Sequence, residues 1–282
     1  MSERQLVAVD IGGTHARFAI ATIAEDGAIS LDDPETLHTA DHVSFQTAWE
    51  DYRERKGGHL PDAVSLAIAG RTSGDAIRFT NNPWVIRPAL IKEKLGATRY
   101  TLVNDFAAVA HAVAQAPDDQ FLHLAGPDQP LAAEGTLSVL GPGTGLGVAH
   151  LWRDSSGYRV QATEGGHVDF APLDQIEDAI LARLRKRHMR VSVERVVSGP
   201  GIVEIYATLA ALEGKPVAEM DDVSIWQAGM EGSDSLAAAA VDRFCLALGS
   251  VAGDFALAQG GFGGVVIAGG LGYRLRDHLP KS

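Results

Sequence analysis

The stretch that decides the fold is Leu6-Val7-Ala8-Val9-Asp10-Ile11-Gly12-Gly13-Thr14, which is followed by a second apolar run from Arg17 to Thr22. Consecutive apolar residues indicate a buried strand, and the glycines between the two runs predict a hairpin turn. Adjacent glycines let successive backbone N–H groups point into one concavity, which can hold phosphate oxygens. The alternative is a tight turn that simply needs glycine. The stretch is not a Walker A loop, because no Gly-Lys-Ser/Thr follows.

The same pattern of strand, glycine loop and strand returns in residues 137–152. Aligning Gly13-Thr14 with Gly143-Thr144 superposes apolar strand positions, namely Val9 on Val139 and Ala19 on Ala149. This internal repeat indicates two similar halves that face each other across a cleft. The second loop, Gly141-Pro142-Gly143-Thr144-Gly145, offers another cradle for phosphates.

Only the first loop carries an acid. Asp10 stands at the end of its strand, where it is placed to hold Mg²⁺ or its waters, whereas Leu140 takes the corresponding position in the repeat. Two loops with a single acid suit the binding of one triphosphate from both sides.

The remaining elements predict an α/β chain. Further strands are expected at Ala63 to Ala69, Tyr100 to Val103 and Gly264 to Ala268, and helices at Asp105 to about Gln115, after Asp174, from Ser198 to near Gly214, and from Asp234 to about Gln259. Asp174 with Glu177 fits a capping box. The break at Ala116-Pro117-Asp118-Asp119 predicts a small N-terminal domain, residues 1–116, and a larger domain, residues 117–282.

Two further segments carry candidate chemistry. Asn104-Asp105 lies where a strand meets a helix, so it is either an N-cap or a general base with a hydroxyl-binding neighbour. Glu164-Gly165-Gly166-His167 could aim an acid and an imidazole at one polyol, or could be a hydrogen-bonded loop. Glu194 alone would be interpreted as a surface glutamate or as half of a pair with Arg195.

Composition excludes several classes. A net charge of -12 over 282 residues repels nucleic acid and anionic membranes, and 46% hydrophobic residues indicate a globular chain. The only cysteine, Cys245, excludes an intrachain disulfide and a multi-cysteine zinc site, and it is expected to be a plain buried thiol. We find neither a signal peptide nor a stretch of about 20 apolar residues, so we expect a cytoplasmic protein.

Taken together, these segments resemble bacterial glucokinase, a sugar kinase family on the actin-like ATPase fold. Six segments carry the resemblance in the family's order: Val9 to Thr14, Leu102 to Phe106, Gly141 to Gly147, Glu164 to Pro172, Glu194 to Gly201, and Ala268 to Gly270. The resemblance implies a two-domain α/β fold with a cleft between the domains. It also implies ATP-dependent phosphorylation of glucose with Mg²⁺, in a protein that we expect to be a homodimer.

The resemblance also assigns roles to residues. Asp105 would be the catalytic base, and glucose hydroxyls would be bound by Asn104, Asp105, Glu164, His167 and Glu194, with Asn81 as a weaker candidate. The ATP phosphates would be held by Asp10, Gly12, Gly13, Thr14, Gly143, Thr144 and Gly145, while Gly269 and Gly270 would flank adenosine. Asp10 would bind Mg²⁺, through water.

Two features depart from the family. His15 stands where the family usually has Asn, and we expect it to tune the site. Relatives continue beyond the adenosine motif to a helix that packs on the first domain, so that closing segment is expected to be absent from a chain that ends at Ser282.

Competing interpretations are a kinase for another hexose or an amino sugar, a non-catalytic sugar sensor, and an actin-like ATPase that assembles or acts as a chaperone. The related repressor and open-reading-frame kinases usually carry a cysteine-rich zinc motif, which a single cysteine rules out.

Overall fold

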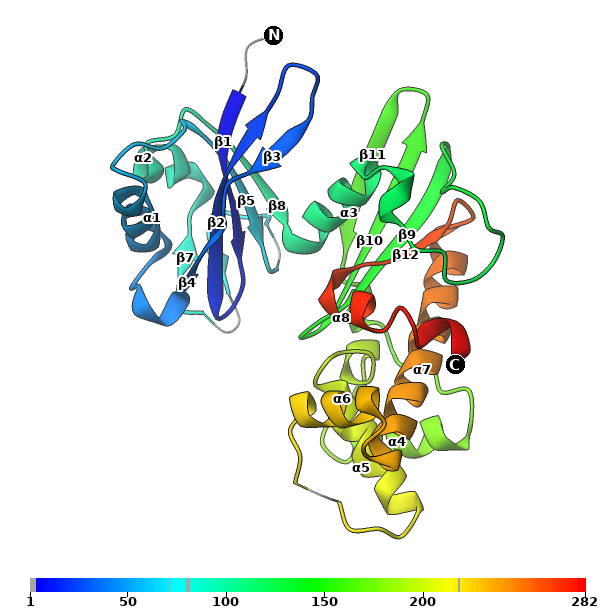
Figure 1. The fold of residues 1–282 in the computed structure, drawn as a ribbon. Coiled ribbons are helices and arrows are strands. Elements are labelled where there is room, and N and C mark those ends of the chain that lie inside the picture. The colour runs from blue at the N-terminus through cyan, green and yellow to red at the C-terminus, as the bar shows by residue number, and fades with distance from the viewer. Residues whose placement is uncertain (1–3, 71, 80–81, 218) are drawn as a thin grey trace. The chain divides into compact units, whose positions relative to one another are not determined.

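The structure is a computed structural model that describes residues 4–70, 72–79, 82–217 and 219–282. The chain divides into two compact units, residues 1–108 and 109–282, which Figure 1 shows from blue to red along the chain. The division falls inside helix α3 (Asp105–Gln115). The predicted domain boundary follows Ala116, just beyond the end of this helix, and it stays a prediction.

A six-stranded sheet forms the centre of the first unit. Its order is β3-β2-β1-β5-β8, with β4 paired to β2. The strands are β1 (Arg4–Ile11), β2 (His15–Ile23), β3 (Ile29–Leu31), β4 (Glu35–His38), β5 (Ala63–Ile68) and β8 (Arg99–Asn104). Because β1, β5 and β8 are parallel, their carboxyl ends meet at one edge, where Ile11 pairs with Ile68 and Ile68 with Asn104.

The core of the first unit lies between this sheet and helix α1 (Phe45–Arg55). Inward residues alternate along the strands, and Phe18 stacks on Tyr52 with ring centroids 4.9 Å apart. Each fully buried aromatic or branched side chain contributes about 1.5–3 kcal/mol. The unit is completed by α2 (Ile91–Leu95), by the 3₁₀ helices Thr39–Asp41 and Pro88–Leu90, and by the paired strands β6 (Ile77–Arg78) and β7 (Val85–Ile86).

The second unit has a four-stranded sheet of order β11-β10-β9-β12. Its strands are β9 (Gly135–Pro142), β10 (Leu146–Asp154), β11 (Gly157–Thr163) and β12 (Val265–Ile267). Its helices are α4 (Gln175–Arg185), α5 (Gly201–Leu212), α6 (Asp222–Glu231), α7 (Ser235–Gln259) and α8 (Gly269–Arg274), with 3₁₀ helices Asp118–Gln120, Gly165–His167, Val193–Arg195 and Leu279–Lys281. Helix α7 contacts α5, α6 and β9, and so fills the centre of this unit.

Side-chain caps start helices α4 and α7 where the sequence predicts. Asp174 accepts a hydrogen bond from the Glu177 backbone N–H, and Asp234 caps α7 in the same way. The predicted capping box is modified, since the Glu177 carboxylate accepts from the Leu173 N–H instead of closing on the N-cap residue. Helix α7 is capped at its carboxyl end by Gly260, whose φ of 66° is left-handed and therefore suits glycine.

The internal repeat extends beyond the hairpins. In each unit a central strand, β1 or β9, is antiparallel to its successor and parallel to a later strand, β5 or β12. The strand pairing of the two hairpins differs by one residue from the predicted superposition. Val139 pairs with Ala149, which aligns with Ala19, whereas Val9 pairs with Phe18. The first loop therefore closes through Gly12 N–H to the His15 carbonyl, and the second is shorter and closes through Gly143 to Gly145.

Helix α7 corrects one prediction. It has 25 residues and is long and apolar enough to cross a membrane by length and composition, contrary to the expectation that no stretch of this chain is. Phe244, Leu248 and Val251 on this helix are buried in the core of the second unit, the arrangement of a core helix. Cys245 lies in the same core, where burial raises the pKa of its thiol to about 11, as expected of an inert buried cysteine.

Candidate active site

The first glycine loop connects β1 to β2 at the carboxyl edge of the first sheet. Asp10 is the penultimate residue of β1 and pairs across the hairpin with Arg17. The Arg17 guanidinium donates to the Asp10 carboxylate at 3.0 Å, and both side chains are about half exposed. Sequence motifs do not single out Arg17; the signal for it is the hairpin register, which places Arg17 opposite Asp10.

The carbonyl groups of this loop are bound by two buried residues. Thr39 donates its hydroxyl to the Gly13 carbonyl at 2.9 Å and its backbone N–H to the Thr14 carbonyl at 3.0 Å. Asn82 Nδ2 donates to the Gly12 carbonyl at 3.4 Å. No local sequence pattern indicated either residue. Asn81, the predicted sugar ligand next to Asn82, lies outside the described residues.

Asn104 and Asp105 lie at the same edge of the first sheet, where β8 ends and α3 begins. Asn104 is the cap of the helix, since its Oδ1 accepts from the N–H groups of Phe106 and Ala107 at 3.0 Å. Its Nδ2 donates to the Gly70 carbonyl at 3.2 Å and to Asp105 Oδ1 at 3.0 Å. The capping interpretation is confirmed for Asn104, and the same bonds hold the Asp105 carboxylate at the start of the helix.

In the second unit, His167 brings the two predicted glutamates together. His167 Nδ1 is 3.2 Å from Glu194 Oε1, and His167 Nε2 is 3.8 Å from Glu164 Oε2. Glu164 and His167 are more than half exposed, whereas the Glu194 side chain is 25% exposed. Glu194 is therefore neither a free surface residue nor half of a pair with Arg195, because the side chain that its carboxylate contacts is the His167 imidazole.

The glycines of this segment serve close packing. A Cβ on Gly166 would lie 2.2 Å from the Leu146 carbonyl oxygen, and one on Gly165 would meet Val148 and Phe255 within 3 Å. Glycine therefore lets the segment lie directly on β10, which places Glu164 and His167 beside the second glycine loop.

The second glycine loop, residues 143–145, lies next to Glu194. A Cβ on Gly145 would be 2.7 Å from Glu194 Oε2, and the Gly143 carbonyl accepts from Gly199 N–H at 2.7 Å. Gly269 and Gly270 begin α8 at the same sheet edge, since the preceding Ala268 N–H donates to the Leu140 carbonyl. Gly269 has a φ of 85°, a left-handed conformation that favours glycine.

Among the described ranges 4–70, 72–79, 82–217 and 219–282, no group of three or more His, Cys, Asp and Glu side chains could hold a metal ion. A magnesium ion in a phosphoryl-transfer site commonly keeps several waters and one or two carboxylates beside substrate phosphates. The half-exposed Asp10 carboxylate at the loop fits that kind of binding.

A family model described as glucokinase matches residues 6–282. The glucokinase of Zymomonas mobilis is 54% identical over 99% of this chain and 86% of that protein. The glucokinase of Caulobacter vibrioides is 41% identical, over 97% of this chain and 82% of its own length. The chain belongs to the glucokinase family.

Solved structures of glucokinases agree with this. The glucokinase of an Antarctic psychrotroph superposes with a TM-score of 0.83 at 33% identity, covering 100% of this chain and 87% of that one. A ROK family glucokinase from Streptomyces griseus, in complex with glucose and AMPPNP, has a TM-score of 0.59 at 18% identity over 99% of this chain and 88% of its own, which shows a shared fold. This member of the glucokinase family is therefore an enzyme, a carbohydrate kinase with the predicted actin-like α/β fold.

Proposed function

We propose that this chain transfers the γ-phosphoryl group of ATP to the 6-hydroxyl of glucose. The observation that carries the proposal is the imidazole of His167 between the carboxylates of Glu164 and Glu194, beside the glycine loop at Gly145. A polyol offers adjacent groups that both donate and accept hydrogen bonds, and a carboxylate–imidazole–carboxylate set matches that alternation.

In this proposal Asp105 is the general base. The sugar oxygen forms a bond to the γ-phosphorus while the bond from that phosphorus to the ADP oxygen breaks, and the hydroxyl proton passes to the Asp105 carboxylate. A carboxylate is a weak base for an alcohol, but phosphoryl transfer has a loose transition state, so proton removal comes late and positioning supplies more of the rate. The hydrogen bonds from Asn104 and from Phe106 N–H hold one Asp105 oxygen in place.

The phosphates would be bound by the backbone of Gly12, Gly13 and Thr14 in the first unit, and by Gly143, Thr144 and Gly145 in the second. Gly269 and Gly270 would flank adenosine. Magnesium would be held by Asp10 through water, and when bound it would neutralise charge on the phosphates. Arg17 would keep the Asp10 carboxylate oriented and would add a further positive charge.

A coupled ADP-release assay across several hexoses tests the proposal. Wild type should turn over ATP only when sugar is present, with glucose preferred, and Asp105→Ala should lose at least a hundredfold in kcat, the lower range for general base catalysis. Asp119→Ala, a change at an exposed aspartate in the second unit, should keep wild-type rates.

Other outcomes of the assay would indicate the competing functions. Faster turnover with another hexose or an amino sugar would mean that the enzyme is a kinase for that sugar, and binding of glucose without turnover would indicate a sugar sensor. ATP hydrolysis that is independent of sugar, or that survives loss of Asp105, would refute the kinase assignment. We also propose a cytoplasmic homodimer with small-molecule substrates; light scattering coupled to size exclusion tests the dimer.

A further inference from the structure

We propose that Thr39 and Asn82 are positioning residues, which fix the peptide planes of the loop Gly12–Thr14 so that the N–H groups of Gly13 and Thr14 face the nucleotide phosphates. The inference rests on the proposed function, because it assigns to these two residues the preparation of the same phosphate site.

The argument starts from the direction of the carbonyl groups. Thr39 binds the carbonyls of Gly13 and Thr14, and Asn82 binds that of Gly12. Thr39 and Asn82 are 3% and 6% exposed, so these three carbonyls point into the unit. In a trans peptide the C=O bond and the following N–H bond point in opposite directions. The N–H groups of Gly13 and Thr14 are therefore turned away from the two buried side chains.

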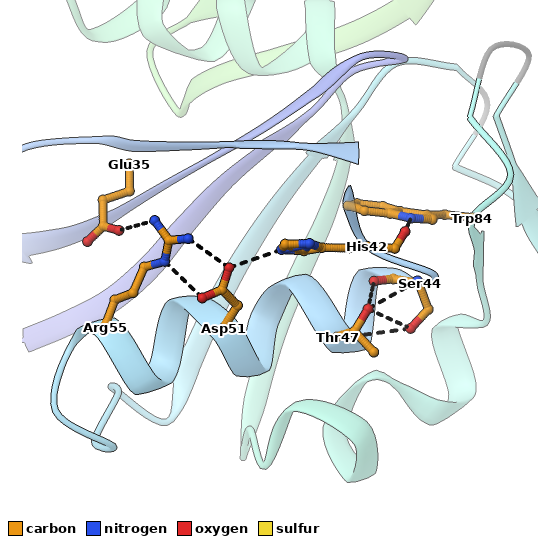
Figure 2. Close-up of polar contacts among 7 residues, drawn as sticks. All are labelled: Glu35, His42, Ser44, Thr47, Asp51, Arg55 and Trp84. Carbon is orange, nitrogen blue, oxygen red and sulfur yellow. Dashed lines mark hydrogen bonds and ion pairs between the residues drawn. The ribbon is translucent and has the colours of Figure 1, made fainter. Parts of the chain in front are cut away.

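Thr39 can impose this direction because the segment that carries it is fixed. We call residues 39–44 the strap. His42 Nε2 lies 3.1 Å from Asp51 Oδ2 on α1, and the Trp84 indole N–H donates to the His42 carbonyl at 2.8 Å (Figure 2). At its far end the strap becomes the N-cap of α1, where Ser44 forms a reciprocal capping box with Thr47.

Asp51, the residue of α1 that contacts the strap, is itself held in place. Asp51 accepts two hydrogen bonds from Arg55, at 2.8 and 2.9 Å, and Arg55 Nη1 lies 3.8 Å from Glu35 on β4. The bond from Arg55 lowers the pKa of Asp51, so the carboxylate that meets His42 stays ionised.

Asn82 is oriented through the same tryptophan. The Trp84 backbone N–H donates to Asn82 Oδ1 at 2.9 Å, which leaves the amide nitrogen toward the Gly12 carbonyl. Trp84 thus fixes both the strap, through its indole, and Asn82, through its backbone. Donors contribute most to charge stabilisation when they are oriented before the substrate binds, and a Gly-Gly loop has much freedom to lose. Thr39 and Asn82 remove that freedom in advance.

The test separates nucleotide from sugar affinity. Thr39→Val keeps the shape of the side chain but leaves the Gly13 carbonyl without its donor. Loss of one such bond should raise the KM for ATP and the Kd of a non-hydrolysable ATP analogue by roughly three- to tenfold, with the KM for glucose within about twofold of wild type. Thr39→Ser should restore ATP affinity because it restores the hydroxyl.

A matched control is Thr208→Val. Thr208 is also buried, at 4% exposure, and donates its hydroxyl to a backbone carbonyl, that of Glu204 at 2.7 Å, but it lies on α5 of the second unit. Thr208→Val should leave the KM for ATP and the KM for glucose unchanged.

Asn82→Asp provides a second variant, since a carboxylate can still accept from the Trp84 N–H but cannot donate to the Gly12 carbonyl. This variant should weaken ATP binding and leave glucose binding unchanged, and it provides the test if Thr39→Val does not fold.

Two results would overturn the inference: wild-type affinity for the ATP analogue in folded Thr39→Val or Asn82→Asp, or an equal loss of ATP and glucose affinity. Failure of the proposed function looks different, because wild type itself would then neither bind the analogue nor turn over ATP with sugar.

Discussion

Gly145→Ala should weaken glucose binding without weakening the fold. The added Cβ would lie 2.7 Å from Glu194 Oε2, whereas ordinary van der Waals contact begins at 3.4 Å. The carboxylate must therefore withdraw by about 0.7 Å. The displaced atom is the tip of a flexible side chain, so the cost to folding is small.

The consequence for glucose follows from the distance between Glu194 and His167. Their atoms Oε1 and Nδ1 are 3.2 Å apart, and a shift of about 0.7 Å away from the imidazole opens this contact to about 3.9 Å. Charge contacts between exposed side chains contribute about 0.2–1 kcal/mol. His167 is 58% exposed but Glu194 only 25%, so we expect a loss at the upper end of this range, about 1 kcal/mol. That corresponds to a roughly fivefold rise in the Kd of glucose.

Isothermal titration with glucose measures the effect, and a thermal melt of the same sample checks the fold. Gly253→Ala is the matched control, because a Cβ there meets nothing within 4 Å and the site lies within α7. The control should bind glucose as wild type does. Unchanged glucose affinity in Gly145→Ala, or a loss confined to ATP, would refute the steric argument.

Three further predictions concern stability. The hydrogen bond from Arg55 lowers the pKa of Asp51, so the Asp51 carboxylate contributes fully to the free energy of unfolding above the ordinary pKa of 3.8, and this contribution is lost as the pH falls through the lowered pKa. Between about pH 6 and about pH 3, the free energy of unfolding should therefore fall more steeply for wild type than for Asp51→Asn, and parallel curves would contradict this. Burial raises the pKa of Tyr52 from 10.0 to about 12. The buried neutral phenol therefore contributes fully to the free energy of unfolding below pH 10.0, and this contribution is lost as the pH rises from 10.0 through about 12. Since the Tyr52 hydroxyl has no hydrogen-bond partner in the part of the chain that the structure describes, Tyr52→Phe should match or exceed wild-type stability at neutral pH and flatten the alkaline loss; a destabilised variant would mean that the hydroxyl is satisfied. Gly201→Ala should destabilise by about 1–3 kcal/mol in urea titration, because its Cβ would lie 2.2 Å from the Val196 carbonyl oxygen, and an unchanged midpoint would refute that clash.

The sequence by itself determined the elements whose signals are local. The strands on either side of Gly12–Thr14 alternate or run apolar within a few residues, and Asp174 and Asp234 cap their helices through bonds to the next turn. The repeat at Gly143 was also visible, because two hairpins of like pattern need like residues. These features are confirmed because hydrogen bonds within a hairpin or a helical turn involve neighbours in the chain.

Only the tertiary structure decided which distant residues meet. The one-residue difference between the two hairpins depends on how each loop closes, and the pairing of Glu194 with His167 depends on how closely Gly166 lies on β10. Thr39 carries no local signal, because the Gly13 carbonyl that its hydroxyl binds lies 26 positions earlier in the chain. Backbone periodicity is written into each segment of sequence, whereas contacts between segments depend on the packing of the whole unit.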